Sequence, residues 1–380
     1  MQHNNLLSRR HFLRNSAGAA FATLGGSVAA QLIEFKPNVR SPDPAVQILD
    51  RSFAKYRIYG STIEQIATGM LWAEGPVYIP QGNFLLFSDV PKNRIMKYDE
   101  ADGRVSIFRN KSHYANGNTR DRQNRLVTCE QSETRCITRT EKNGDITTLA
   151  ATFEGKRFNG PKDIVVKSDD SIWFTDPTFG LNGEWGGTKA TPELATTNVF
   201  RIGADGKVTA VRTELVNPCG LAFSKDEQKL YVAEGQGTPN VAVGQRTPTR
   251  RIWSYDVAAD RITLSNKFKL VDATDRGAID GFRVDLDGNL WCGWGIDGEL
   301  ALTTTDVDGR KVYQLKEKSE QLDGVRVFNS SGDPLAHISL PERCTNLCFG
   351  GSAGNRLYMT CCHSVYALDV EAYSAIKQVV

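Results

Sequence analysis

The sequence predicts an all-β protein, a six-bladed β-propeller with a central channel. A unit of two strand-like runs around a polar turn recurs six times, and its copies begin 42 to 65 residues apart. Further strand–turn–strand patterns lie between the copies, which gives about four strands per unit. No sustained 3.6-residue apolar period occurs after the N-terminal segment. A two-sheet sandwich is the alternative, but it would not predict a fixed register within each unit.

The register of the repeat fixes where the strands are expected. Each copy opens with a short alternating run, usually after Gly, and its second strand opens on Leu or Ile. The expected first residues of the second strands are Leu85, Leu126, Ile172, Leu230, Leu290 and Leu357. Residues 73–380 are therefore predicted to form the propeller. Residues 31–72 are a lead-in segment, in which Pro37, Pro42 and Pro44 indicate an extended linker.

Residues 1–30 resemble a bacterial twin-arginine signal peptide. Arg9 and Arg10 precede an uncharged run from Asn15 to Leu32, and Val28-Ala29-Ala30 has the small side chains of a cleavage site. The alternative is a disordered or amphipathic N-terminus. The run is too short and too weakly apolar for a stable membrane anchor. The resemblance implies that the twin-arginine translocation machinery exports the folded protein to the periplasm.

Composition excludes several classes of function. Removing the three arginines of residues 1–30 from the 46 basic residues leaves 43 against 44 acidic residues, which gives no support for nucleic-acid binding. Only three histidines remain, without an HExxH motif, so a zincin-type protease is excluded. Most of the eight cysteines lie in apolar strand-like runs and are expected to be buried as free thiols. Disulfides, which an oxidising compartment permits, are the alternative.

Two insertions interrupt the repeat at corresponding points, after the second strands of units three and four. They span Leu181 to Thr197 and Gly235 to Thr249. Loops of this length on a compact scaffold are often functional, although disordered surface segments remain the alternative.

Equivalent positions of the six units are expected to form a ring around the channel. The residues that precede each repeat start are Glu74, Asn116, Lys162, Cys219, Asp280 and Thr345, with Asn118, Arg157, Asn159 and Asp163 beside them. Converging carboxylates and amides suit a hard cation such as calcium or magnesium, because buried charge is costly unless it is paired or bound to metal. A solvated channel with salt-linked polar residues is the alternative.

Five motifs occur in order over roughly residues 73 to 369: EGPVY, RFNGPKDIVVKSDDSIWFTDP, CGLAFSKDEQKLYVAE, DGFRVDLDGNLW and PERCTNLCFGG. Together they resemble the gluconolactonase, senescence marker protein and luciferin-regenerating enzyme family. The resemblance implies a propeller that hydrolyses sugar or related lactones with one divalent cation in its channel. It makes Glu74 a metal ligand, and Asp280 both a ligand and the general acid/base.

The sequence departs from the family pattern at two ring positions. The third metal ligand of the family, usually Asn, is here Cys219, a soft donor that would weaken calcium binding or favour zinc. A substrate-side Asn is here Lys162, with Asp163 retained. The lysine could repel a cation, pair with Asp163 or Asp280, or stabilise an oxyanion.

The leading hypothesis is a periplasmic lactonase that uses a divalent cation, most simply calcium. Its ligands would be Glu74, Asp280 and Cys219, and Asp280 would move the proton. The predicted substrate-binding residues are Asn118, Arg157, Asn159, Lys162 and Asp163. Two alternatives remain: a non-catalytic propeller that binds a ligand or protein, and a different hydrolase or lyase on the same scaffold.

Overall fold

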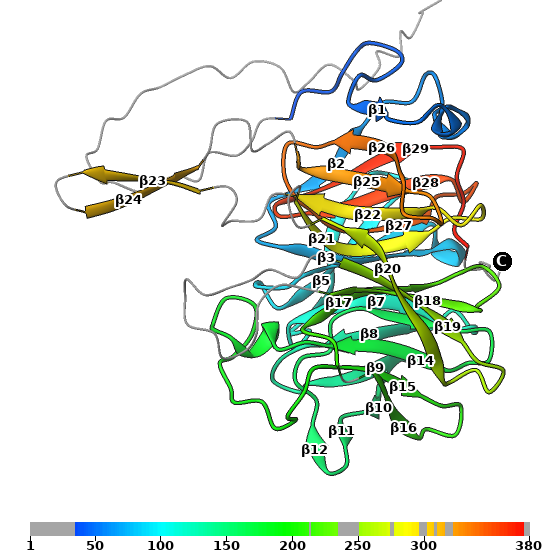
Figure 1. The fold of residues 1–380 in the computed structure, drawn as a ribbon, viewed down its shortest axis with the longest axis vertical. Helices are drawn as coiled ribbons and strands as arrows, with labels where there is room; N and C mark the ends of the chain where they lie inside the picture. The colour runs from blue at the N-terminus through cyan, green and yellow to red at the C-terminus, as the bar shows by residue number, and fades with distance from the viewer. Residues whose placement is uncertain are drawn as a thin grey trace, which may run out of the picture. The chain divides into compact units, whose positions relative to one another are not determined.

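The computed structural model describes residues 35–212, 214–234, 251–273, 277–295, 302–307, 310–315 and 322–375. These residues form six antiparallel sheets of four or five strands, with two short two-stranded hairpins (Figure 1). Each large sheet is one blade, so the predicted six-bladed, all-β fold is confirmed. The predicted signal peptide, residues 1–30, and the insertion Gly235 to Thr249 lie outside the described residues.

The first strands of the six blades form a closed ring, because each contacts the first strand of the next blade and the sixth contacts the first. These inner strands are β3 (Ala73–Ile79), β7 (Ala115–Arg120), β13 (Ile164–Val166), β17 (Pro218–Phe223), β21 (Ala278–Val284) and β27 (Cys344–Gly350). The second strands are β4 (Phe84–Asp89), β8 (Leu126–Glu130), β14 (Ile172–Asp176), β18 (Lys229–Glu234), β22 (Leu290–Gly295) and β28 (Arg356–Cys361).

The third and fourth strands complete the blades outward. The third strands are β5 (Arg94–Asp99), β9 (Cys136–Thr140), β15 (Asn198–Ile202), β19 (Arg251–Val257), β25 (Gly324–Phe328) and β29 (Ser364–Asp369). The fourth strands are β6 (Val105–Asn110), β10 (Ile146–Ala150), β16 (Val208–Arg212), β20 (Leu264–Asp272), β26 (Pro334–Ser339) and β2 (Glu64–Thr68). The remaining elements are β1 (Val46–Ile48), β11 (Thr152–Phe153), β12 (Lys156–Arg157), β23 (Leu302–Val307), β24 (Arg310–Leu315) and the 3-10 turns η1 (Arg51–Tyr56), η2 (Pro80–Gly82) and η3 (Phe179–Leu181).

The second strands begin where the repeat predicts them. Leu126, Ile172 and Leu290 open β8, β14 and β22, and the other three second strands begin one residue before the predicted leucine. The register follows from side-chain alternation and from tight polar turns, which are short-range properties of the sequence.

The lead-in segment contributes two strands to the propeller. Strand β2 pairs with β29 and completes the sixth blade, and β1 pairs with β26 at the edge of the fifth. The ring of blades therefore closes by joining an N-terminal strand to the last blade of the chain. This pairing covers the backbone edge of β29, which would otherwise be open to another chain.

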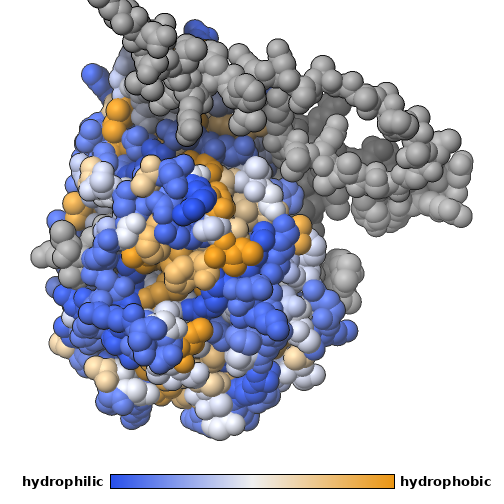
Figure 2. All heavy atoms as spheres, turned by 180° about the vertical axis from the view of Figure 1, so that it is seen from behind, coloured by the Kyte–Doolittle hydropathy of each residue, from blue (hydrophilic) through white to orange (hydrophobic). Residues whose placement is uncertain are grey.

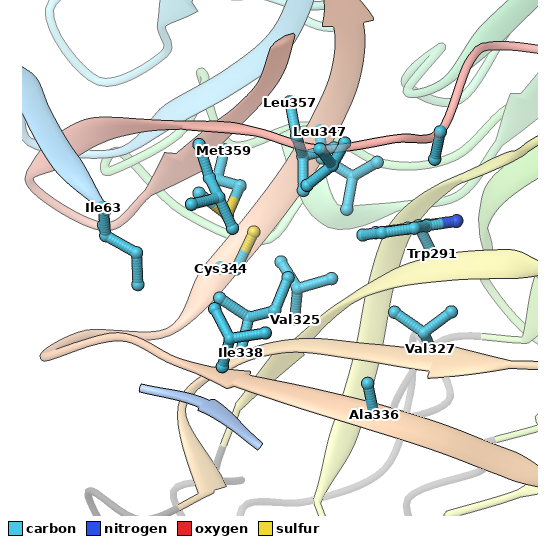
Figure 3. Packing of buried hydrophobic residues seen from close by; sticks show 14 of the residues in the cluster. Ile63, Trp291, Val325, Val327, Ala336, Ile338, Cys344, Leu347, Leu357 and Met359 are labelled. Atoms are coloured by element: carbon cyan, nitrogen blue, oxygen red, sulfur yellow. The ribbon is translucent and has the colours of Figure 1, made fainter. Parts of the chain in front are cut away.

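Apolar side chains fill the space between neighbouring blades. Between the fifth and sixth blades, Trp291 and Val325 pack against Cys344, Leu347 and Met359, all of them with no exposed surface (Figure 3). Burying each of the larger side chains stabilises the fold by about 1.5–3 kcal/mol. This packing holds the inner strands in fixed positions around the channel.

Glycine follows the ring position in four blades because the inner strands approach one another closely. A Cβ atom on Gly75 would lie 2.0 Å from the backbone oxygen of Asn116, and one on Gly117 would lie 2.3 Å from that of Lys162. Gly75 also has a φ of 52°, which other residues adopt only with strain. The repeated Gly thus allows the ring to close.

All eight cysteines lie within the described residues as free thiols, and seven of them are buried, which confirms the prediction. No helix in the described ranges has the length and apolar composition needed to cross a membrane. On the face shown in Figure 2, the surface is largely hydrophilic, and apolar residues gather towards its middle.

Candidate active site at the channel

A pocket of about 460 Å³ opens over the ring residues. Five of the six predicted ring residues line it, together with Arg343: Glu74, Asn116, Lys162, Cys219 and Asp280. Apolar side chains also contribute to its lining: Trp72, Val90, Pro91, Phe179, Trp185 and Ile279. Charged and polar groups inside an apolar rim are the usual composition of a small-molecule site.

Thr345, the sixth predicted ring residue, does not line this pocket. Its hydroxyl donates a hydrogen bond to the backbone oxygen of Ala73, the residue before Glu74. The short side chain therefore joins the sixth blade to the first. Arg343, two residues earlier in the chain, lines the pocket instead.

Lys162 links carboxylates from two other blades. Its Nζ lies 2.7 Å from Oδ1 of Asp280 and 3.1 Å from Oε1 of Glu74. Nη2 of Arg343 lies 3.2 Å from the second oxygen of Asp280. Burial lowers the pKa of Lys162, but the two carboxylates outweigh that effect and raise it well above its ordinary value. The lysine is therefore an ammonium ion at neutral pH.

Glu74, a member of this cluster, is fully buried. Its Oε2 accepts hydrogen bonds from the backbone N–H of Gly75 and from the side-chain amide of Asn346. Burial raises the pKa of Glu74 to about 7, although the neighbouring Lys162 ammonium opposes the shift.

Cys219 is present in the pocket as a neutral thiol. Burial raises its pKa to about 12, and its Sγ lies 3.6 Å from the backbone oxygen of Asn217. The side-chain oxygen of Asn217 accepts hydrogen bonds from the N–H and the hydroxyl of Thr178. The nearby asparagine is thus used in holding a loop, and the thiol occupies the ring position.

Four of the five predicted substrate-binding residues do not line this pocket. Asp163 pairs with Arg283, whose Nη1 lies 3.3 Å away, and Asn118 donates hydrogen bonds to Gly75 and Ser88. The buried side chain of Asn159 donates to backbone oxygens of Asp176 and Thr196, and Arg157 donates to backbone oxygens of Glu133 and Thr134. Lys162 alone among the predicted five reaches the pocket.

The first insertion, Leu181 to Thr197, forms part of the pocket rim. Asn182, Gly183, Trp185 and Gly186 line it, and Trp185 is 61% exposed. Gln131 ties this loop to the ring, because its amide donates to the backbone oxygen of Gly186 and accepts a 2.7 Å hydrogen bond from Asn116. The side-chain oxygen of Asn116 is buried and has no hydrogen-bond partner within the described part of the chain.

Within the described ranges, no group of three or more His, Cys, Asp and Glu side chains is arranged to hold a metal ion. The two carboxylates predicted as ligands instead share the Lys162 ammonium, and the third predicted ligand is a protonated thiol. Calcium prefers six to eight oxygen ligands. The residues present therefore do not fit a calcium site in the arrangement that the structure shows.

A family model described as "SMP-30/Gluconolactonase/LRE-like region" matches residues 72–363. A gluconolactonase of Zymomonas mobilis is 28% identical over 383 residues, covering 95% of this chain and 92% of its own. A gluconolactonase structure from Xanthomonas campestris is 31% identical with a TM-score of 0.70, and the match covers 86% of this chain and 94% of that one. The calcium-binding protein regucalcin of Agrobacterium tumefaciens shares the fold. It is 16% identical with a TM-score of 0.59, and the match covers 81% of this chain and 92% of that one.

Proposed function

Because the chain belongs to the SMP-30/gluconolactonase/LRE-like family, we propose that it is a lactonase that hydrolyses sugar-type lactones. The observation that carries the proposal is the Asp280 carboxylate, held in the pocket between the cationic groups of Lys162 and Arg343. Water attack on an ester carbonyl uses a proton acceptor and a group that stabilises the developing negative charge. The carboxylate can supply the first and the neighbouring cationic donors the second.

In the proposed reaction, water attacks the lactone carbonyl carbon and Asp280 accepts its proton. The negative charge develops on the carbonyl oxygen, facing the cationic donors of the pocket. When the carbonyl re-forms, the ring C–O bond breaks and Asp280 returns the proton to the leaving oxygen. The product is a hydroxy acid, whose carboxylate is also attracted to the positive groups.

Two features of the pocket support a sugar-type substrate. The unpartnered amide oxygen of Asn116 is suited to accept a hydrogen bond from a hydroxyl group. Trp72, Phe179 and Trp185 offer apolar surfaces against which the C–H groups of a sugar ring can pack.

The family resemblance predicts a divalent cation held by Glu74, Asp280 and Cys219, and regucalcin is described as calcium-binding. In this chain the donor set does not fit that ion, because the two carboxylates share the Lys162 ammonium and Cys219 is a neutral thiol.

We also propose export by the twin-arginine pathway to the periplasm, with cleavage near Ala30. Paired Arg9 and Arg10 before an uncharged run, followed by small residues, support this proposal.

The experiment that tests the lactonase proposal is a pH-stat assay of the protein without residues 1–30 on glucono-, galactono- and pentonolactones. We expect acid release well above the spontaneous rate for at least one of them, with saturation kinetics. A protein that binds these lactones but never turns them over would be a binding propeller instead, and the proposal would fail.

A further inference from the structure

We propose that the Lys162 ammonium, together with Arg343, takes the place of the divalent cation, so that this chain works without a metal. The catalytic half of this inference rests on the proposed lactonase function. The half that concerns metal binding does not rest on that function, because it follows from the geometry of four charged side chains: Glu74, Lys162, Asp280 and Arg343.

The ammonium of Lys162 lies between the two carboxylates of the predicted metal site. Glu74 and Asp280, from the first and fifth blades, are the two carboxylates that the family resemblance makes metal ligands. The Nζ atom of Lys162 lies between them, 3.1 Å from one and 2.7 Å from the other. The ammonium therefore occupies the space between the groups that would otherwise hold an ion.

The charges of this cluster can balance without a metal ion. When both carboxylates are ionised, Lys162 and Arg343 supply two positive charges against the two negative charges of Glu74 and Asp280. A divalent cation would supply the same two charges. Adding one to the existing cluster would leave two uncompensated positive charges in a largely buried site, which is strongly unfavourable.

The backbone of Lys162 is held from both sides. Its backbone N–H donates to Thr175 at 2.9 Å and its backbone oxygen accepts from Gly117 at 2.7 Å, so both neighbouring segments fix its Cα. The residue is 6% exposed. To admit an ion, the ammonium would have to give up both carboxylates while its backbone stays in place.

The geometry also gives Lys162 a chemical role. An ammonium group has three N–H donors, and the side-chain hydrogen bonds of Lys162 within the described residues go to two carboxylates. The third donor is left for the carbonyl oxygen of a bound lactone. As water adds and the carbonyl electron pair moves onto that oxygen, the ammonium stabilises the charge, and no proton or electron beyond those of water is needed.

The test begins with metal binding, measured by calorimetry on metal-free protein without residues 1–30. Calcium, magnesium, manganese and zinc are titrated to 1 mM into the wild type and into the Lys162→Asn/Cys219→Asn double variant, which restores an amide at both positions that depart from the family pattern. We expect no binding to the wild type and stoichiometric calcium binding to the variant. Lys162→Gln serves as a second variant if the double variant does not fold.

Two outcomes would overturn the inference. One is that the wild type binds any of these ions stoichiometrically and that Glu74→Gln abolishes this binding. The other is a folded double variant that still binds no ion, because the lysine would then not be what excludes it.

The catalytic half is tested on whichever lactone the wild type hydrolyses. EDTA should leave kcat/KM unchanged, and Lys162→Met should lower kcat by about 10²–10³-fold, the usual cost of losing one oxyanion donor. Lys229→Met is the matched control, since Lys229 also lies 2.7 Å from an Asp but on the exterior. Dependence on added metal, or full activity of Lys162→Met, would overturn this half. If no lactone is hydrolysed, the proposed function fails while the binding experiment still decides the metal question.

Discussion

The ammonium of Lys162 in the third blade lies 2.7 Å from the carboxylate of Asp280 in the fifth. Each of these residues stands at the ring position of its blade, so the propeller brings together two side chains that are 118 positions apart in the chain. The contact joins the proposed proton carrier to the proposed charge-stabilising group. The pocket chemistry therefore depends on closure of the whole ring.

Replacing Asp280 by Asn should lower kcat by about 10²–10⁴-fold, because general acid–base catalysis contributes that much and an amide cannot accept the proton. The fold should survive, since Asn can still accept a hydrogen bond from Lys162. Lactone turnover and far-UV circular dichroism would measure the two effects. Asp205→Asn, in an exposed turn, is the control, and a variant within tenfold of wild type would exclude Asp280 as the proton carrier.

Replacing Trp185 by Ala should raise KM about tenfold and leave kcat nearly unchanged. The indole lies on the pocket rim and is 61% exposed, so it contributes to substrate contact more than to the fold. Steady-state kinetics would show the split between KM and kcat. Phe268→Ala removes a similarly exposed aromatic side chain from β20 and should change neither constant. If Trp185→Ala and Phe268→Ala changed KM and kcat equally, the loop that carries Trp185 would not contribute to substrate binding.

Replacing Gly75 by Ala should destabilise the protein by roughly 3 kcal/mol or more, because the added Cβ collides with the backbone oxygen of Asn116 at 2.0 Å. Gly103→Ala is the control. That glycine also has a positive φ, 70°, but a Cβ there would meet nothing within 4 Å, so only about 1 kcal/mol is expected. Urea denaturation of both variants would separate backbone strain from collision, and equal losses would contradict this account of the ring.

The blades could be predicted from the sequence because their signals are local. Alternating side chains and turns such as Asp287-Gly288 determine strand and register over a few residues, and the repeat then supplies the architecture. The role of the lead-in was harder to predict. Its prolines indicate a linker, yet residues 64–68 complete the sixth blade through pairing with β29, about 300 residues away.

The site was predictable only as far as the repeat extends. Equivalent positions brought Glu74, Lys162 and Asp280 together as expected, but nothing in the repeat marks Arg343. Successive side chains of an extended chain point in opposite directions, so Asp163 turns away from Lys162 and pairs with Arg283. Sequence proximity to a site residue therefore does not place a neighbour in the pocket.

Replacing both Arg9 and Arg10 by Lys should stop export and leave the uncleaved protein in the cytoplasm. The twin-arginine signal is recognised through its paired arginines, and Lys keeps the charge but not the guanidinium geometry. Cell fractionation and immunoblotting would locate the protein. Arg14→Lys is the control and should be exported normally. Export of the double variant at the wild-type level would contradict the proposed pathway.

Asp176 should make the stability of the protein depend on pH. Burial raises the pKa of this carboxyl to about 7, although it accepts hydrogen bonds from the backbone N–H groups of Asn159 and Gly160. Its pKa in the unfolded chain is near 3.9. The folded state therefore holds a proton that the unfolded chain releases between about pH 4 and pH 7, and the contribution of Asp176 becomes less favourable as the pH rises through that window.

Replacing Asp176 by Asn should flatten the pH dependence of the unfolding free energy between pH 4 and pH 7, by an amount on the order of a few kcal/mol. The absolute stability of the variant is not the readout, because an amide reproduces only one of the two hydrogen bonds that the carboxyl accepts. Urea denaturation at intervals of half a pH unit would give both slopes. Asp102→Asn, at an exposed turn, is the control and should keep the wild-type slope. If Asp176→Asn also kept the wild-type slope, the carboxyl of Asp176 would titrate normally.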